Sequence, residues 1–390
     1  MHFSNRANGL GESATVRVTR LAEELRAEGR DIVDLSAGQP DFPSPAVAVE
    51  AVHQALDQGF TRYTAAAGIP DLRRALAERY QEIYGAPWGL PNAMVTVGAK
   101  TGLFEIALAL VDEGNSVVLP TPAWVSFAEQ IRFAGGRVVE VPMSADDGFA
   151  IHAQPIIDAF EDRTRMVVIN SPSNPTGGLI SEEDLRILVE ACAARDIVVL
   201  SDETYEHFVY GGARHASAAS LAEEFPGTVV LVGSFSKTYA MTGWRLGYCL
   251  GSETLIRKLV AIQSHSTSNP TSFAMRGGLA ALHHGGEDVR RMIEAFERRR
   301  DFLVQGLEEV PGVTCETPSG AFYAFPRVAA HYREGRNSSI ELAEHLLREA
   351  GLAVVPGAAF GADEHIRLSF ACSRSELSRA LERLRSTLAV

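Results

Sequence analysis

The sequence predicts an α/β protein with two parts: a large domain on a mostly parallel seven-stranded sheet, and a smaller α/β domain. Three observations lead to this prediction. Seven short β-rich runs are separated mainly by helix-length stretches, which is typical of a sheet covered by helices on both faces. After Gly286 the pattern changes to a long charged helix followed by scattered strand signals. A chain of 390 residues is also too long for one small core.

The N-terminal region is expected to contain an arm and the first elements of the small domain. Residues 1–15 are interpreted as an N-terminal arm, and residues 16–44 as part of the small domain. The spacing of Val16, Leu21 and Leu25 predicts a helix that ends at Gly29. Asp31–Leu35 predicts a short strand that follows it.

The large domain is predicted to span residues 45–285. A capping-box-like pattern at Ser181–Asp184 marks the start of one of its helices. The seven strands are expected at Ala93–Val97, Ser116–Leu119, Arg137–Val141, Met166–Ile169, Ile197–Leu200, Thr228–Val232 and Leu246–Leu250.

Residues 286–390 are predicted to complete the small domain. A charged amphipathic helix is expected from about Glu287 to Glu309. Strand signals follow it at Gly320–Phe325, Ala353–Val355 and His365–Phe370.

Composition argues against several classes of partner. The net charge of −13 at pH 7 disfavours binding to nucleic acid or to an anionic membrane surface. The longest apolar runs, such as Ile106–Val111, are too short to span a bilayer, and the first fifteen residues do not look like a signal peptide, so a cytoplasmic location is predicted. No metal site is predicted, because the cysteines and histidines lack ligand spacing, including His207, His265, His283 and His284.

The choice of basic residue singles out one lysine. Only three of the 36 basic residues are lysine: Lys100, Lys237 and Lys258. An ammonium, unlike a guanidinium, can lose its proton near neutral pH and attack a carbonyl. Lys237 follows the apolar run Thr228–Val232 in a small polar turn, which places an amine at the end of a strand. A surface lysine in an arginine-rich chain is the alternative interpretation.

Other polar motifs also follow predicted strands, at the edge where ligands of open α/β sheets bind. Gly98 and Ala99 precede a helix expected from Leu103, so their N–H groups could hold a phosphate. A rigid loop rich in proline and glycine presents Asn174. Asp202 and Tyr205 end a third strand. The alternative interpretations are a tight turn at Gly98 and Ala99, a purely structural loop around Asn174, and a solvated acid at Asp202.

A further group of residues near Lys237 suits phosphate binding. Ser234, Ser236 and, eight residues after Lys237, Arg245 supply hydroxyl and guanidinium donors around the amine.

In order and spacing, these motifs resemble those of the aspartate aminotransferase superfamily, whose members have the type I fold of pyridoxal 5'-phosphate enzymes. Ser-Asp-Glu-x-Tyr is followed, thirty-five residues after its Asp, by Ser-x-Ser-Lys and then by Gly-Trp-Arg. The similarity extends from about Ser13 to Leu388.

The resemblance implies roles at the cofactor. Lys237 would bond covalently to the cofactor's aldehyde and later move the substrate proton. Asp202 would keep the pyridine nitrogen protonated. Asn174 and Tyr205 would donate hydrogen bonds to the phenolic oxygen and so lower the pKa of the imine nitrogen that joins Lys237 to the cofactor. The residues implied at the phosphate and ring are Gly98, Ala99, Lys100, Ser234, Ser236, Arg245, a stacking Trp124 and Tyr63 from a partner subunit. A buried core tryptophan is the alternative for Trp124.

The resemblance also implies substrate contacts. Arg367 and the Gly38 backbone would bind the α-carboxylate, beside Trp124 and Asn174. Phe127 replaces a histidine of the animal-type branch, so the chain looks like the bacterial branch. In that branch a lysine at the position of Lys100 binds the distal carboxylate of dicarboxylic substrates. Ser13 and Thr15 match a segment that closes over the substrate.

The resulting expectation is a homodimeric aminotransferase, with an active site shared between subunits, that moves an amino group from aspartate or a related acid to 2-oxoglutarate by a ping-pong mechanism. Prephenate, aromatic, alanine-type or other biosynthetic transamination stays open. The effector domain of a transcription regulator is disfavoured because only about fifteen residues precede the fold. A Rossmann dehydrogenase is disfavoured because Gly98–Phe104 lacks the Gly-x-Gly-x-x-Gly pattern.

Overall fold

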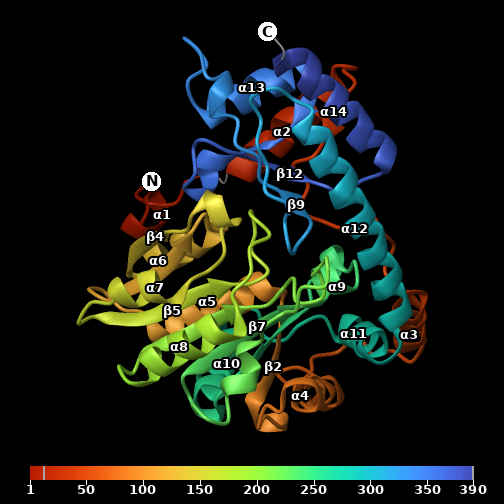
Figure 1. Cartoon of the computed structure of the whole chain (residues 1–390). Helices are drawn as coiled ribbons and strands as arrows, with labels where there is room; N and C mark the ends of the chain where they lie inside the picture. Colours follow the sequence, from red (N-terminus) through yellow and green to blue (C-terminus); the bar gives the residue numbers. More distant parts are fainter. Residues whose placement is uncertain (12–13, 389–390) are drawn as a thin grey trace.

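The chain is described by a computed structural model that covers residues 1–11 and 14–388. A large body with the main sheet forms the lower part of Figure 1, and a smaller body lies above it. The main sheet has seven strands in the order β2-β8-β7-β6-β5-β3-β4. The predicted α/β class, with a mostly parallel seven-stranded sheet, is therefore confirmed.

All seven strands lie where the sequence predicts them. Only β8 runs against the others, since its pairings with β2 and β7 are antiparallel and the remaining four pairings are parallel. The strands are β2 (Ala93–Thr96), β3 (Ser116–Thr121), β4 (Arg137–Pro142), β5 (Thr164–Asn170), β6 (Val198–Asp202), β7 (Val229–Ser234) and β8 (Gly247–Leu250).

The sheet is buried on both faces, which explains why its strands read as continuous apolar runs. Side chains alternate across a strand, so Val167 and Ile169 of β5 belong to one apolar core while Met166 and Val168 belong to another. The first core includes residues of α4 (Pro70–Tyr84), α7 (Ala153–Asp158), α8 (Glu182–Ala193) and α11 (Ser272–His284). The second includes residues of α5 (Ala99–Leu110), α6 (Val125–Ala134) and α10 (Glu253–Ser266).

The capping pattern predicted at Ser181 is present. The Ser181 hydroxyl accepts a hydrogen bond from the Asp184 backbone N–H at 2.9 Å, which caps α8. In contrast, α5 begins at Ala99, four residues before the predicted Leu103, so its first turn directly follows Gly98.

The smaller body contains two small sheets and its own aromatic core. One sheet pairs β1 (Val33–Asp34) with β10 (Leu352–Ala353), and the other has the order β11-β12-β9. Phe296, Phe322 and Phe370 are fully buried in its core. Its other elements are β9 (Tyr323–Ala324), β11 (Val355–Pro356), β12 (Ile366–Ser369), α2 (Ala14–Ala27), α13 (Ser339–Ala350) and α14 (Arg374–Leu388).

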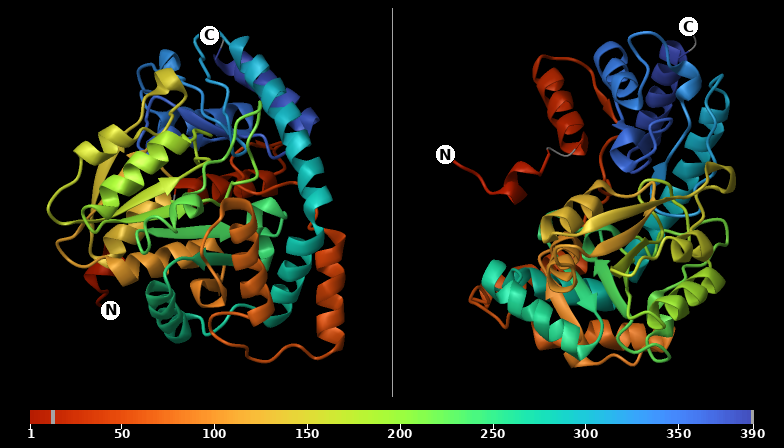
Figure 2. Two further views of the ribbon diagram at one scale, coloured as in Figure 1. Left: turned by 60° about the horizontal axis from the view of Figure 1, so that its bottom comes forward. Right: turned by 90° about the vertical axis from the view of Figure 1, so that its left-hand side faces the viewer.

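Two helices connect or extend the bodies. The helix α12 (Gly286–Glu308) runs along one side of the molecule from the lower body to the upper one, beside α3 (Ala46–Asp57) at its lower end (Figure 1). The short α1 (Asn5–Asn8) projects from the main body in the second view of Figure 2 and contains no buried residue. The domain boundaries at residues 45 and 286 stay a prediction. Ser13, which the sequence places in a segment that closes over the substrate, lies outside the described residues.

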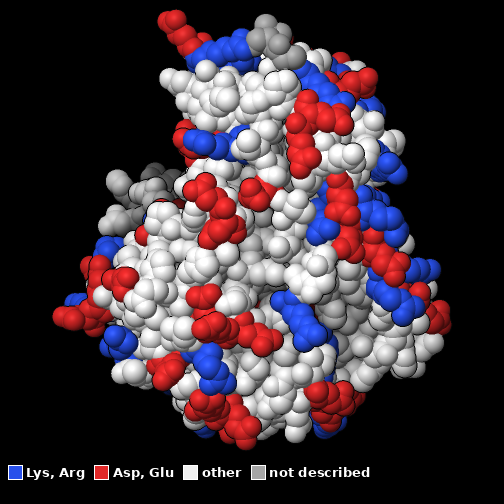
Figure 3. Space-filling model, in the orientation of Figure 1, with Lys and Arg blue, Asp and Glu red and all other residues white. Residues whose placement is uncertain are grey.

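Acidic and basic side chains are interspersed over the face shown in Figure 3. Along α12 they form pairs one turn apart, such as Arg290 with Glu287 and Arg291 with Asp288. Among the described residues, no helix has the length and apolar character needed to cross a membrane.

Candidate active site

The polar motifs converge because their strands end at one edge of the sheet. Ser234 of β7 pairs with Gly247 of β8, which in turn pairs with Thr96 of β2. Since β8 is antiparallel to β7, its beginning lies where β7 ends. The connection between them carries Lys237 and Arg245, so both residues are returned to this edge.

A cavity of about 310 Å³ opens at this edge. It brings together twelve of the fourteen predicted site residues: Gly38, Ala99, Lys100, Trp124, Asn174, Asp202, Tyr205, Ser234, Ser236, Lys237, Arg245 and Arg367. Gly98 lies directly behind the cavity wall, against the Arg245 guanidinium. Tyr63 is 89% exposed and does not line the cavity of its own chain.

The Lys237 amine lies inside this cavity, on the short helix α9 (Phe235–Thr238). Burial, with the positive charges of Arg367 and Arg245, lowers the pKa of the amine to about 8. Its Nζ donates a hydrogen bond to the carbonyl of Gly38, 199 residues away in the sequence. With a pKa of about 8, roughly a tenth of this amine is uncharged at pH 7, and the uncharged form is the one that a nucleophile or base requires.

Asp202 ends β6 and is only 5% exposed. Burial raises the pKa of its carboxyl to about 6, although a hydrogen bond from Thr204 and the charge of Lys237 oppose the shift. This bond runs from the Thr204 N–H to Asp202 Oδ1 at 3.1 Å. A buried carboxylate with few partners is suited to hold a proton on a bound cationic ring nitrogen.

A second end of the cavity offers donors for an anion. The first turn of α5 presents its backbone N–H groups, next to the hydroxyls of Ser234 and Ser236. A Cβ on Gly98 would stand 2.5 Å from Arg245 Nη2, so only glycine lets the guanidinium lie against this turn. A Cβ on Gly247 would stand 2.3 Å from the Ala99 nitrogen. The two glycines thus permit the close approach that assembles the anion site.

Arg367, on β12, is 2% exposed and reaches the cavity from the smaller body. Its Nη1 donates to Asn174 Oδ1 at 2.9 Å and its Nη2 donates to the carbonyl of Ser36 at 2.8 Å. Its Nε is buried without a protein partner. A buried donor left unsatisfied is costly, so the hydrogen-bonding capacity of this guanidinium is not fully used within the protein.

Lys100 lies at the rim of the cavity with its Nζ 4.8 Å from the centre of the Trp124 ring. Partial burial and the charge of Arg245 lower the pKa of its amine. Trp124 is half-buried and lines the cavity, so its ring is available to a ligand rather than enclosed in the core. Phe127, the departure from the animal-type pattern, packs edge-on against Trp124, with ring centres 5.3 Å apart.

The sequence reasoning missed several cavity residues, of which Tyr323 has the closest polar contact. Its hydroxyl lies 2.8 Å from the Tyr205 hydroxyl, and its ring lies under Arg367, 4.4 Å from Cζ. Asn170 is another: its Nδ2 donates to the Asp202 carbonyl at 3.1 Å and its Oδ1 accepts from the Asn174 N–H. Asn170 is the first residue of the loop that the sequence singled out, although only Asn174 was named from it. The predicted strand at Gly320–Phe325 carried no polar signal that pointed to Tyr323.

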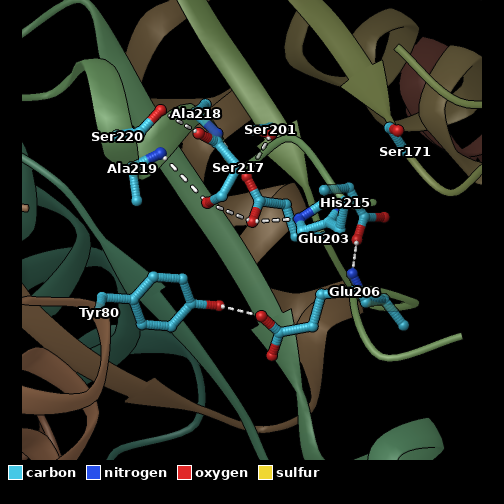
Figure 4. Close-up of polar contacts among 12 residues, drawn as sticks. Tyr80, Ser171, Ser201, Glu203, Glu206, His215, Ser217, Ala218, Ala219 and Ser220 are labelled. Carbon is cyan, nitrogen blue, oxygen red and sulfur yellow. Dashed lines mark hydrogen bonds and ion pairs between the residues drawn. The ribbon is translucent and has the colours of Figure 1, made fainter. Parts of the chain in front are cut away.

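Behind the cavity, a buried network holds the residue next to Asp202. Glu203 accepts hydrogen bonds from Ser201 Oγ, Ser217 Oγ and the Ala218 N–H at 2.7 to 2.9 Å (Figure 4). His215 Nε2 lies 2.9 Å from the same carboxylate. Burial alone would lower the pKa of His215, but the charge and hydrogen bond of Glu203 and the charge of Glu206 together raise it. The network fixes the backbone that presents Asp202.

Comparison with known proteins identifies the family. Residues 30–384 match the sequence pattern of the family described as aminotransferase class I and II. The chain belongs to this family. This aminotransferase is 43% identical over 388 residues to a probable aspartate/prephenate aminotransferase from Aquifex aeolicus, covering 99% of this chain and 98% of that one. It is 39% identical to the aspartate aminotransferase of Bacillus subtilis, with 99% and 98% covered.

Solved structures agree with the sequence comparison. This aminotransferase matches the aspartate aminotransferase of Thermus thermophilus with maleate at a TM-score of 0.93, with 40% identity and 99% of each chain covered. For the enzyme from Rhizobium meliloti the TM-score is 0.95, with 35% identity and 100% and 99% covered. The predicted family, fold and enzyme class are therefore confirmed. Within the described part of the chain, no group of three or more His, Cys, Asp or Glu side chains is arranged to hold a metal ion.

Proposed function

We propose that this protein is a pyridoxal 5'-phosphate-dependent aspartate aminotransferase, a cytoplasmic homodimer that transfers the amino group to 2-oxoglutarate by a ping-pong mechanism. One observation carries the proposal: a single cavity holds an amine of lowered pKa, Lys237, together with a buried acid and an anion site. The names of the relatives supply the preference for aspartate.

The donor set suits this cofactor at each of its polar points. The buried carboxylate of Asp202 would hold the proton of the pyridine nitrogen. The α5 N-terminus, Ser234, Ser236 and the Arg245 guanidinium, cradled by Gly98, would hold the phosphate. When bound, pyridoxal 5'-phosphate supplies an aldehyde that reacts with amines and a ring that accepts electrons.

The residues of the chain would supply proton transfer and the polar contacts that the cofactor needs. In its neutral form, Lys237 Nζ would take the proton from the substrate Cα as a general base, and in its protonated form it would deliver this proton to the aldehyde carbon of the cofactor as a general acid. Asp202, as a fixed negative charge in a buried position, would keep the ring nitrogen protonated. Asn174 and Tyr205 would donate hydrogen bonds to the phenolic oxygen of the cofactor.

Two cations would recognise the substrate. The Arg367 guanidinium would bind the α-carboxylate, because it lines the cavity, is already held by Asn174 and Ser36, and loses little entropy on binding. Gly38 would add a backbone contact to the same group. Lys100, at the rim, would leave the Trp124 face to bind the distal carboxylate of aspartate.

The proposed dimer would complete the site. Tyr63 belongs to the predicted phosphate contacts, yet it is 89% exposed and does not line the cavity of its own chain. A large exposed aromatic side chain is typical of a buried interface position in an assembly. Tyr63 would therefore reach the phosphate of the partner subunit.

Prephenate is the second candidate amino acceptor. Three relatives at 41 to 43% identity are named as aspartate/prephenate aminotransferases, two of them as probable ones. Prephenate, like 2-oxoglutarate, has a carboxylate beyond its 2-oxo acid group, so Lys100 could serve for both.

A half-reaction panel tests the proposal. The purified protein with pyridoxal 5'-phosphate is mixed with aspartate, glutamate, phenylalanine or alanine, and the cofactor absorbance is followed. We expect aspartate to react with the highest kcat/KM. Addition of 2-oxoglutarate should then restore the original absorbance of the cofactor. A protein that does not change its absorbance with any amino acid would refute aminotransfer, and a preference for phenylalanine would refute aspartate specificity.

A further inference from the structure

Tyr323 makes close contacts with three parts of the site but has no role in the scheme above. It lies on β9 of the smaller body, is 1% exposed and lines the cavity. Its hydroxyl lies 2.8 Å from that of Tyr205, and its ring lies under Arg367. A Cβ on Gly38 would stand 3.1 Å from the same hydroxyl. The Gly38 backbone, whose carbonyl accepts a hydrogen bond from Lys237, therefore also packs against Tyr323.

The pairing of two hydroxyls constrains which of them can act on a ligand. Each tyrosine hydroxyl carries one proton, and in the pair one oxygen donates while the other accepts. If Tyr205 donated to Tyr323, it would have no proton left for a ligand. If Tyr323 donates to Tyr205, the Tyr205 proton is free to point into the cavity. Burial raises the pKa of Tyr323, which keeps this hydroxyl protonated.

The ring of Tyr323 faces a second functional group. Arg367 Cζ lies 4.4 Å from its centre, within the range of a cation–π contact. The hydrogen bonds to Asn174 and Ser36 hold the two terminal nitrogens, while the ring supports the flat face of the guanidinium. The Phe360 ring also lies near the guanidinium, 5.2 Å from Cζ. The position of Arg367 thus depends on these two rings and on its two hydrogen bonds, and not on the Tyr323 hydroxyl.

We propose that Tyr323 is a positioning residue with two separable functions: its hydroxyl donates to Tyr205 and directs that hydroxyl toward the cofactor, and its ring supports Arg367. This inference rests on the proposed function. A hydroxyl that accepts a hydrogen bond becomes a better donor, because hydrogen bonds in a chain polarise one another. Tyr323 therefore strengthens the bond from Tyr205 to the phenolic oxygen of the cofactor.

The hydroxyl is tested by Tyr323→Phe, which keeps the ring. The readout is the apparent pKa of the pH-dependent change in the visible absorbance of the cofactor-loaded protein. A stronger bond to the phenolic oxygen lowers this pKa, so the variant should raise it by about 0.2 to 0.5 unit. In a Tyr205→Phe background the same substitution should have no further effect, because the influence passes through Tyr205.

A matched control is available in the same core. Tyr210 is also buried, and its hydroxyl donates to the carbonyl of Ala321 at 2.6 Å without lining the cavity. Tyr210→Phe should leave the absorbance pKa unchanged. An unchanged pKa in Tyr323→Phe would refute the inference, and a lowered pKa would refute it by showing that Tyr323 competes for the Tyr205 proton.

The ring is tested by Tyr323→Leu. Loss of the cation–π contact should raise KM for every amino donor by about three- to tenfold, whereas Tyr323→Phe should keep KM within about twofold. An equal rise in both variants would refute the division between ring and hydroxyl. A wild-type protein that shows no Lys237-dependent cofactor absorbance would overturn the proposed function itself. Normal wild-type absorbance with an unaffected Tyr323→Phe variant would overturn only this inference.

Discussion

Replacement of Lys100 by alanine tests how the side-chain carboxylate is recognised. Lys100 is at the rim, and its amine lies 4.8 Å from the centre of the Trp124 ring. If it binds the distal carboxylate, the variant should lose rate with aspartate and glutamate and keep it with phenylalanine. If it only helps the α5 N-terminus to hold a phosphate, cofactor affinity should fall and the donor ranking should stay the same.

The magnitude follows from what Lys100 gains and what it gives up. A charge-assisted hydrogen bond is worth about 1.5 to 3 kcal/mol. To form it, the amine leaves the Trp124 face, which costs about 0.5 to 1 kcal/mol at an exposed site. The net contribution is about 0.5 to 2.5 kcal/mol, so kcat/KM for aspartate should fall about 2- to 70-fold.

The assay compares half-reaction rates with aspartate and phenylalanine at saturating cofactor. Lys258, an exposed lysine on α10, provides the matched control, because Lys258→Ala removes one positive charge away from the cavity. We expect that control to behave as the wild type with both donors. An equal loss for both donors in Lys100→Ala would refute the dicarboxylate assignment.

Three further predictions concern the centre of the site. Lys237→Ala and Lys237→Arg should both abolish turnover. In the cofactor-free wild type, the rate of cofactor binding should rise about tenfold per pH unit below the pKa of about 8 and level off above it, since only the neutral amine attacks. A pH-independent rate in stopped-flow absorbance would contradict this. Asp202→Asn should slow the half-reaction with aspartate by about three orders of magnitude, or about 4 kcal/mol, so a near-normal rate would mean that another group holds the ring proton. Arg367→Lys should raise KM for all amino donors alike, by about tenfold or more, because an ammonium cannot replace the fork held by Asn174 and Ser36; a donor-selective effect in steady-state kinetics would contradict this.

Local sequence was sufficient for most of the sheet and for the edge at which the site forms. The strands are buried on both faces, so each appears as an apolar run, and the loops that follow them carry the polar groups. Lys237, Asp202 and Asn174 could be named because each lies within a few residues of a strand end. The start of α5 could not be predicted in this way, because the helix begins directly after Gly98, before the apolar pattern does.

The long-range contacts were decided only by the tertiary structure. The reversal of β8 places Arg245 against Gly98, and no local pattern encodes which strand pairs with which. Tyr323 meets Tyr205 across 118 residues, and Lys237 meets Gly38 across 199. Periodicity shows which residues are buried, but the packing of the two bodies determines which polar groups then face each other. The shift of the Lys237 pKa has the same origin, because burial and the nearby arginines exist only in the folded chain.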